Sequence, residues 1–114
     1  KNVVVDEDGM DNITAATGSG PAFLYYIYEQ YAKSLEELGF SKEDADKLTR
    51  NLVIGTGKTL SERPESFEKL RTDITSKAGT TEAGLDTLSE SKLQEIIFET
   101  LGSARDRSIK LSER

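Results

Sequence analysis

The chain has 114 residues, which fits one domain, and it contains neither cysteine nor histidine. Disulfides, thiol chemistry, histidine-ligated zinc and His-dependent triads are therefore excluded within it. A net charge of −6 argues against nucleic acid and anionic membranes as partners, and without a membrane span of roughly 20 apolar residues or a basic-apolar leader we expect a cytoplasmic protein.

The first nine residues differ in pattern from the rest. Residues 2–5 (Asn-Val-Val-Val) are the sole β-branched run, and an acidic turn ending at Gly9 follows. We interpret residues 1–9 as the remnant of an interdomain strand or linker. From Met10 the apolar spacing is helical, so residues 10–114 are predicted to form an all-α domain of five to six helices.

Three helices and their end signals can be placed before Pro64. A short helix from Met10 to about Ala16 is expected to stop at Thr17–Gly20. Pro21 then suits the first turn of a helix that runs to about Leu38, with Gly39 as its C-terminal cap. Ser41 and Asp44 resemble a capping box for a helix to about Glu62. The side chains expected to be buried in that helix are Ala45, Leu48, Leu52 and Leu60.

Three further helices complete the chain. Phe67, Leu70 and Ile74 mark a helix, and a polar loop from Thr75 to Thr80 follows it. A short helix is expected over Thr81 to Leu88. The final helix is predicted to start from a capping box of Ser91 and Gln94. Its apolar positions are Leu93, Ile97, Leu101, Ala104 and Leu111.

Two features suggest that a second copy of the chain covers this domain. Residues 22–28 are apolar or aromatic on every side, and a helix of that kind is buried all round. Gly55 and Gly57 lie inside a helix, where close approach of another helix would justify their cost. Tyrosines whose hydroxyls stay hydrated, and a simple kink, are the alternatives. The predicted interface residues are Phe23, Tyr26, Ile27 and Gly55.

The segment from Thr75 to Thr81 is the one motif that predicts ligand chemistry. A glycine-containing turn that enters a helix offers free backbone N–H groups and a partial positive charge, and hydroxyls add further donors. Such a turn suits a carboxylate or phosphate, although many similar turns only cap their helix. No nucleotide motif or metal site is recognisable, because Gly18–Gly20 and Gly57–Thr59 each match only part of a known pattern.

The succession of motifs resembles a known family. Thr17-Gly18-Ser19-Gly20-Pro21-Ala22 opens the aromatic helix, Gly55-Thr56-Gly57-Lys58 follows, and Leu70 to Thr81 and Arg105 to Ser108 come last. From about Asp11 to Leu111 this order resembles the C-terminal, dimer-forming domain of pyrroline-5-carboxylate reductase. The chain departs from the family loop at Lys77, which replaces a proline, and at Ala78, which replaces a glycine.

The resemblance implies a fold, a reaction and partners. Family members reduce 1-pyrroline-5-carboxylate to L-proline with NADPH or NADH, the last step of proline biosynthesis. An N-terminal Rossmann domain binds most of the cofactor, and we expect it to be missing here, so that this fragment alone is inactive. The helical domains of two copies interlock as a homodimer, with higher oligomers possible. Each site then combines one subunit's cofactor domain with the partner's loop.

The resemblance also implies roles for individual residues. Thr81 would be catalytic, near the ring nitrogen, and the substrate carboxylate would be held by Ser76, Gly79, Thr80 and Thr81. Glu62 would face the imine nitrogen. The residues expected near the cofactor are Asp73, Ile74, Ser19 and Gly20. No metal is expected.

Two other readings remain open. A stand-alone helical dimerisation module without a catalytic role would need no Ser-Thr-Gly loop. Another Rossmann-linked imine or hydroxy-acid reductase is the second, and such enzymes usually place a catalytic lysine on a long central helix; Lys58 is the only candidate, and its neighbourhood does not match.

Overall fold

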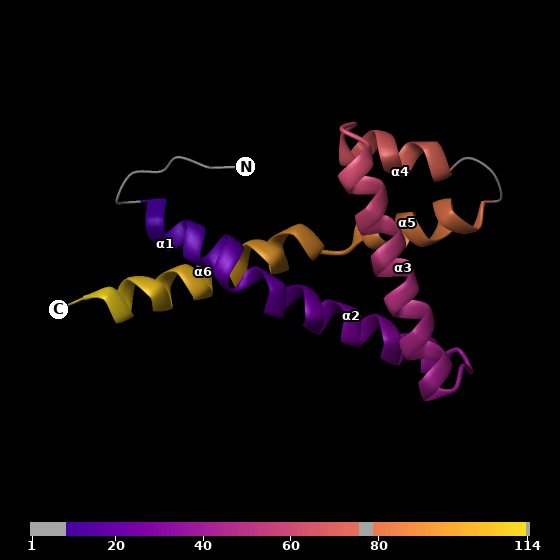
Figure 1. Cartoon of the computed structure of the whole chain (residues 1–114), viewed down its shortest axis with the longest axis horizontal. Coiled ribbons are helices and arrows are strands. Elements are labelled where there is room, and N and C mark those ends of the chain that lie inside the picture. Colours follow the sequence, from indigo (N-terminus) through magenta and orange to yellow (C-terminus); the bar gives the residue numbers. More distant parts are fainter. Residues whose placement is uncertain (1–8, 76–78, 114) are drawn as a thin grey trace. The chain divides into compact units, whose positions relative to one another are not determined.

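The computed structural model of the chain describes residues 9–75 and 79–113, and these residues form helices without a strand (Figure 1). The all-α prediction is therefore confirmed for this part of the chain. The predicted strand at residues 2–5 lies outside the described residues. The elements in chain order are α1 (Met10–Ile13), the π-helical turn η2 (Thr14–Gly18), α2 (Gly20–Glu37), α3 (Lys42–Glu62), α4 (Phe67–Thr75), α5 (Thr80–Glu90) and α6 (Leu93–Ser112).

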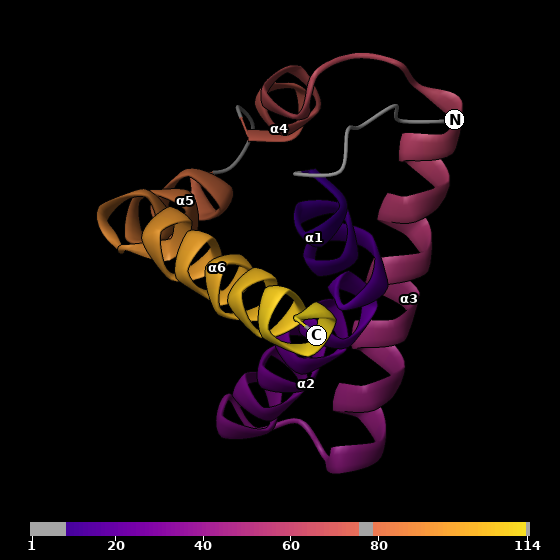
Figure 2. The same ribbon diagram turned by 90° about the vertical axis from the view of Figure 1, so that its left-hand side faces the viewer.

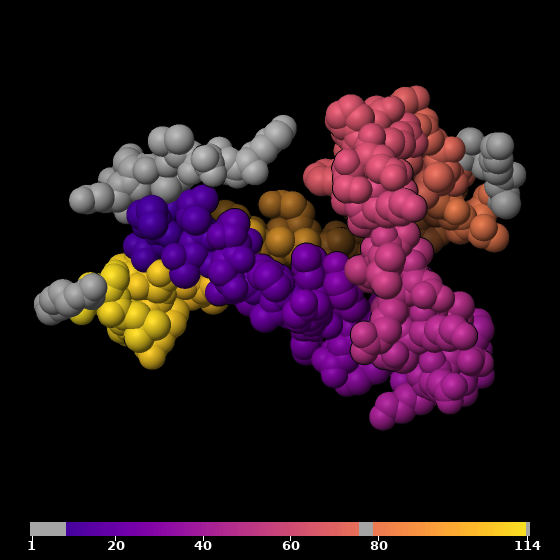
Figure 3. Space-filling model, viewed as in Figure 1, coloured from indigo at the N-terminus to yellow at the C-terminus, as the bar shows by residue number. Residues whose placement is uncertain are grey.

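The chain divides into two compact units. The first combines Lys1–Ile27 with Lys92–Arg114, and the second is Tyr28–Ser91. In the first unit, α1 and η2 pack against α6, as two views show (Figure 1 and Figure 2). Figure 3 shows the atoms of α1 lying directly on the end of α6. A hydrogen bond of 2.7 Å, donated by the Ser108 hydroxyl to the Asp11 carboxylate, joins the two helices.

The predicted stop after Ala16 is wrong, because the helix continues through a wider turn. The Ser19 amide donates to the Thr14 carbonyl, five residues back, at 3.1 Å, as in a π-helix. Helix α2 follows at once from Gly20, and Pro21 occupies its first turn as predicted. Ala15, on the π-helical turn, is only 2% exposed.

Local signals set the helix ends in the second unit as the sequence predicted. Gly39 has a φ of 114°, a conformation that favours glycine, and the Gly39 and Phe40 amides bond to the Glu36 and Leu35 carbonyls. The Ser41 hydroxyl accepts the Asp44 amide at 3.0 Å and caps α3. Helix α3 ends at Glu62, just before Pro64, as expected.

The predicted capping box at Ser91 is wrong. The Ser91 hydroxyl and amide both donate to the Leu88 carbonyl, so Ser91 closes the end of α5. Lys92 precedes the first residue of α6 instead. No side chain caps the start of α6.

The buried apolar core of the described residues is small. Its members are Ala15 and Ala45, and the nearby buried Thr49 donates its hydroxyl to the Ala45 carbonyl at 2.8 Å. The prediction of a buried Ala45 is confirmed. The prediction for Leu48, Leu52 and Leu60 is wrong within a single chain, since each is more than two-fifths exposed. Their apolar stripe has no partner in the described part of the chain.

Candidate functional site

A glycine in a left-handed conformation starts α5. Gly79 has φ 75° and ψ −18°, and its carbonyl accepts the Ala83 amide at 3.0 Å. An L-residue with a side chain is strained at this φ, so glycine is favoured here. The helix begins at Thr80, one residue earlier than the sequence predicted, and ends two residues later at Glu90.

The first turn of α5 is open to a ligand. Thr80 and Thr81 are exposed, and no side chain in the described residues caps this helix end. The first amides of a helix have no partner within it and carry a partial positive charge, so they favour an anion. Ser76, the third expected hydroxyl, lies outside the described residues.

Asp73 is held by two cations. Its Oδ1 lies 2.9 Å from Lys69 Nζ, and its Oδ2 lies 3.0 Å from Arg63 Nη2. Hydrogen bonds from Lys69 and then Arg63 are the main reasons that the pKa of Asp73 lies below its usual value. The expected cofactor-proximal carboxylate therefore stays charged at neutral pH and has both oxygens bound by its own chain.

Arg63 also binds Glu65, which completes a four-residue ion cluster: Arg63, Glu65, Lys69 and Asp73. The guanidinium contacts the Glu65 carboxylate at 3.0 Å through Nη2 and 3.3 Å through Nε. This pairing lowers the pKa of Glu65 and raises that of Arg63. Sequence reasoning missed the cluster, since no periodic pattern relates Arg63 to Asp73 across ten residues. Pro64, which marks a turn next to Arg63, was the sequence feature that could have indicated this cluster.

The other expected residues of the second unit lie along α3 and α4. Glu62 is the last residue of α3 and is exposed. Ile74 is 72% exposed next to Asp73, so it is not a core residue of the single chain. The second unit thus contains Glu62, Asp73, Ile74, Gly79, Thr80 and Thr81.

Ser19 and Gly20 belong to the first unit, at the junction of η2 and α2. The Ser19 carbonyl accepts the Ala22 and Phe23 amides at 3.1 and 3.3 Å. A Cβ on Gly20 would have no atom within 4 Å. A ligand can therefore approach the backbone closely here.

The expected interface residues lie on open helix faces. Tyr26 is 64% exposed and Ile27 is 46% exposed, whereas Phe23 is half-buried. In the middle of α3, no atom lies within 4 Å of the Cβ positions built on Gly55 and Gly57. These exposed apolar faces are of the kind that a partner covers.

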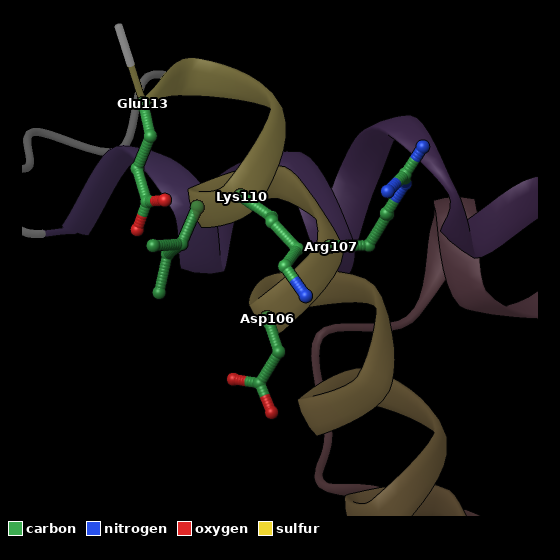
Figure 4. A pocket seen from close by; sticks show the side chains of 5 residues that line it. Asp106, Arg107, Lys110 and Glu113 are labelled. Carbon is green, nitrogen blue, oxygen red and sulfur yellow. The ribbon is translucent and has the colours of Figure 1, made fainter.

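A wide-open hollow on α6 is separate from all of these residues. It is lined by Asp106, Arg107, Ile109, Lys110 and Glu113, and Figure 4 shows the labelled side chains projecting from successive turns of the helix. Among the described residues there is no group of three or more potential metal-ligating side chains, and no helix there is long and apolar enough to cross a membrane.

The comparisons with known proteins agree with one another. The family model described as "Pyrroline-5-carboxylate reductase dimerisation" matches residues 7–111. Pyrroline-5-carboxylate reductase from Staphylococcus aureus (strain COL) is 51% identical over 110 residues, which is 96% of this chain and 41% of the relative. The enzyme of that name from Staphylococcus haemolyticus is 45% identical over 111 residues, 97% of this chain and 41% of the relative.

Solved structures give the same result. A pyrroline-5-carboxylate reductase from Coxiella burnetii matches with a TM-score of 0.90 and 36% identity, over 97% of this chain and 41% of that one. Plasmodium falciparum pyrroline carboxylate reductase with NADP bound has a TM-score of 0.87 over 96% of this chain and 42% of that one, and at 24% identity it shows a common fold. The chain spans about two-fifths of the length of the curated relatives it matches.

Proposed function

This chain belongs to the pyrroline-5-carboxylate reductase dimerisation family, and we propose from that premise that it is the helical domain of an enzyme that reduces 1-pyrroline-5-carboxylate to L-proline. The match over residues 7–111, which includes the segments Thr17–Ala22 and Thr75–Thr81, is the observation that carries the proposal. A nucleotide-binding domain would complete the enzyme, and the 114-residue chain alone would be inactive.

The open start of α5 supports a role in holding the substrate. The substrate is a cyclic imine with a carboxylate, and amides at a helix start bind such an anion. The Thr80 and Thr81 amides, with the Gly79 backbone and the Ser76 hydroxyl, would bind the carboxylate. The Thr81 hydroxyl would lie by the ring nitrogen, where reduction adds a proton, and Glu62 would face the same atom. Catalysis by this domain is then mainly orientation of the imine.

The nicotinamide cofactor, NADPH or NADH, would supply the hydride for the imine carbon when bound. The described residues suit the nicotinamide end of the cofactor, because Ile74 leaves 72% of its surface open and a flat ring can pack on it. Asp73 lies beside Ile74 in the chain, and Ser19 and Gly20, which belong to the first unit, are proposed as further residues near the cofactor. The phosphates and ribose would be bound by the nucleotide-binding domain.

A second copy of the chain is the partner that the exposed apolar faces support. Tyr26 and Ile27 of α2 and the glycine stretch of α3 would meet the same elements of the partner in an interlocked homodimer. Phe23 and Gly55 would belong to the same interface. Each active site would then use the loop of one subunit and the cofactor domain of the other. We place the enzyme in the cytoplasm.

Replacing Thr81 with alanine in the full-length enzyme tests the proposal. A hydrogen bond to a charged or reacting group is worth about 1.5–3 kcal/mol, so kcat/KM should fall about 10- to 100-fold. The assay follows NADPH oxidation with 1-pyrroline-5-carboxylate, and Thr87→Ala, an exposed threonine on the same helix, is the matched control. Wild-type kinetics in Thr81→Ala would refute the role of Thr81. A full-length protein without any reductase activity would favour a non-catalytic dimerisation module.

A further inference from the structure

We infer that Arg63 and Lys69 are positioning residues of the reductase, which hold the carboxyl end of α4 through Asp73 and neutralise its charge next to the substrate-binding segment. The inference deepens the proposed function and rests on it for the identity of the substrate. The observation behind it is that each oxygen of the Asp73 carboxylate binds a different cation, Oδ1 binding Lys69 and Oδ2 binding Arg63.

The backbone explains why Arg63 is available for this contact. The residue before a proline is restricted to an extended conformation, and Arg63, ahead of Pro64, has φ −120° and ψ 122°. Its amide still closes α3 by donating to the Thr59 carbonyl at 2.9 Å. The chain therefore turns sharply here, and the Ser66 hydroxyl accepts the Lys69 amide at 3.1 Å near the start of α4.

The guanidinium is fixed from two directions. Glu65 is bound by Nε and Nη2 together, the planar two-point arrangement that arginine forms with a carboxylate. The same Nη2 reaches Asp73 at 3.0 Å. Since Asp73 lies in the last turn of α4, this contact ties the end of α4 to the residue that follows α3. Lysine at position 63 would provide a charge without the two-point geometry.

The two cations offset an unfavourable position of Asp73. The carboxyl end of a helix carries a partial negative charge, so an acidic side chain in the last turn is unfavourable unless cations offset it. Six residues later, Gly79 starts the helix whose amides we propose for the substrate carboxylate. Helix α4 contacts α5, so an uncompensated carboxylate in the last turn of α4 would oppose an anion bound at the start of α5. Arg63 and Lys69 remove that opposition while they hold the helix end.

The test compares Arg63→Gln, Lys69→Gln and Asp73→Asn in the full-length reductase with Arg50→Gln as control. Arg50 lies on α3 and forms an exposed ion pair with Asp46 at 2.7 Å, so its replacement removes the same charge and an ion pair outside the cluster. Hydrogen exchange of the α4 amides should rise about two- to fivefold in Arg63→Gln, as expected for loss of exposed ion pairs. In the same Arg63→Gln variant, KM for 1-pyrroline-5-carboxylate should rise at least threefold, and kcat should stay within about twofold of the wild-type value.

Rescue and coupling separate positioning from a general loss of structure. KM in Arg63→Lys should lie between the values of wild type and Arg63→Gln. In an Asp73→Asn background, Arg63→Gln should change KM little further. Unchanged α4 exchange, an unchanged KM, or an Arg63→Gln effect that persists without Asp73 would each overturn the inference. If wild-type protein does not reduce 1-pyrroline-5-carboxylate, the proposed function fails, and the exchange measurement alone decides whether Arg63 and Lys69 hold α4.

Discussion

Replacing Gly79 with alanine separates backbone strain from side-chain packing at the start of α5. Gly79 has φ 75°, and no atom lies within 4 Å of a Cβ built on it. The left-handed backbone alone should therefore destabilise the Gly79→Ala variant, by about 1–2 kcal/mol. Alanine also restricts the unfolded chain, which offsets roughly 0.5 kcal/mol of that loss. Gly84→Ala, inside the same helix with the same open space, should instead stabilise by about 0.5–1 kcal/mol.

Thermal unfolding of both variants at the same protomer concentration measures these opposite changes in stability. A net loss of about 1 kcal/mol should lower Tm by roughly 4 °C in Gly79→Ala, and Tm should rise in Gly84→Ala. Any part of this strain that Gly79→Ala relieves by relaxing the turn must be restored when the full-length enzyme binds substrate, so the fall in Tm and the rise in KM share the same loss of about 1 kcal/mol, and KM should increase by at most about fivefold. A Gly79→Ala protein with wild-type Tm and wild-type KM would refute the assignment of both the strain and the anion-binding turn.

Two further predictions concern assembly and pH. At micromolar concentration, light scattering should give the chain about twice its monomer mass of 12.6 kDa. The Tyr26→Glu variant should be monomeric, whereas Lys33→Glu, elsewhere on α2, should stay dimeric. A monomeric wild-type chain would contradict the interface. The pKa of Asp73 is lowered in the folded state, so the contribution of the cluster is present above its unfolded pKa of about 3.9 and disappears as pH falls through the lower, folded value. The Tm difference between wild type and Asp73→Asn should accordingly be constant from about pH 5 to 8 and shrink below about pH 4, and a difference that varies within the neutral range would count against this.

The elements that the sequence predicted correctly depend on local chemistry. Gly39 ends α2, Ser41 caps α3 and Pro21 occupies a first helical turn, because each requirement involves only a few neighbouring residues. The helical spacing of apolar residues located the main helices for the same reason. The Ser91 capping box failed because α6 starts one residue later than its spacing implied, after Lys92, and the Ser91 hydroxyl donates to the Leu88 carbonyl at the end of α5.

The predictions that failed or stayed untested depend on distant partners. Leu48, Leu52 and Leu60 form a regular stripe, yet burial requires a second surface that the described chain does not provide. Asp73 was expected near the cofactor, and its contact with Arg63 follows from the turn at Pro64 rather than from any repeat. The roles of Thr81 and Glu62 concern a bound substrate, that of Ser19 concerns a bound cofactor, and Ser76 lies outside the described residues, so these roles remain predictions.

The π-helical turn at Thr14–Gly18 contains one residue more than an α-helical path would need. Each residue of an α-helix advances the chain by about 100° around its axis, so that surplus residue sets the direction in which α1 leaves α2. Deleting it would turn Asp11 away from Ser108 and swing any segment attached ahead of α1 by more than a quarter of a circle. The length of the segment between Thr14 and Gly18 thus sets the heading of whatever precedes α1, while α2 keeps its own course.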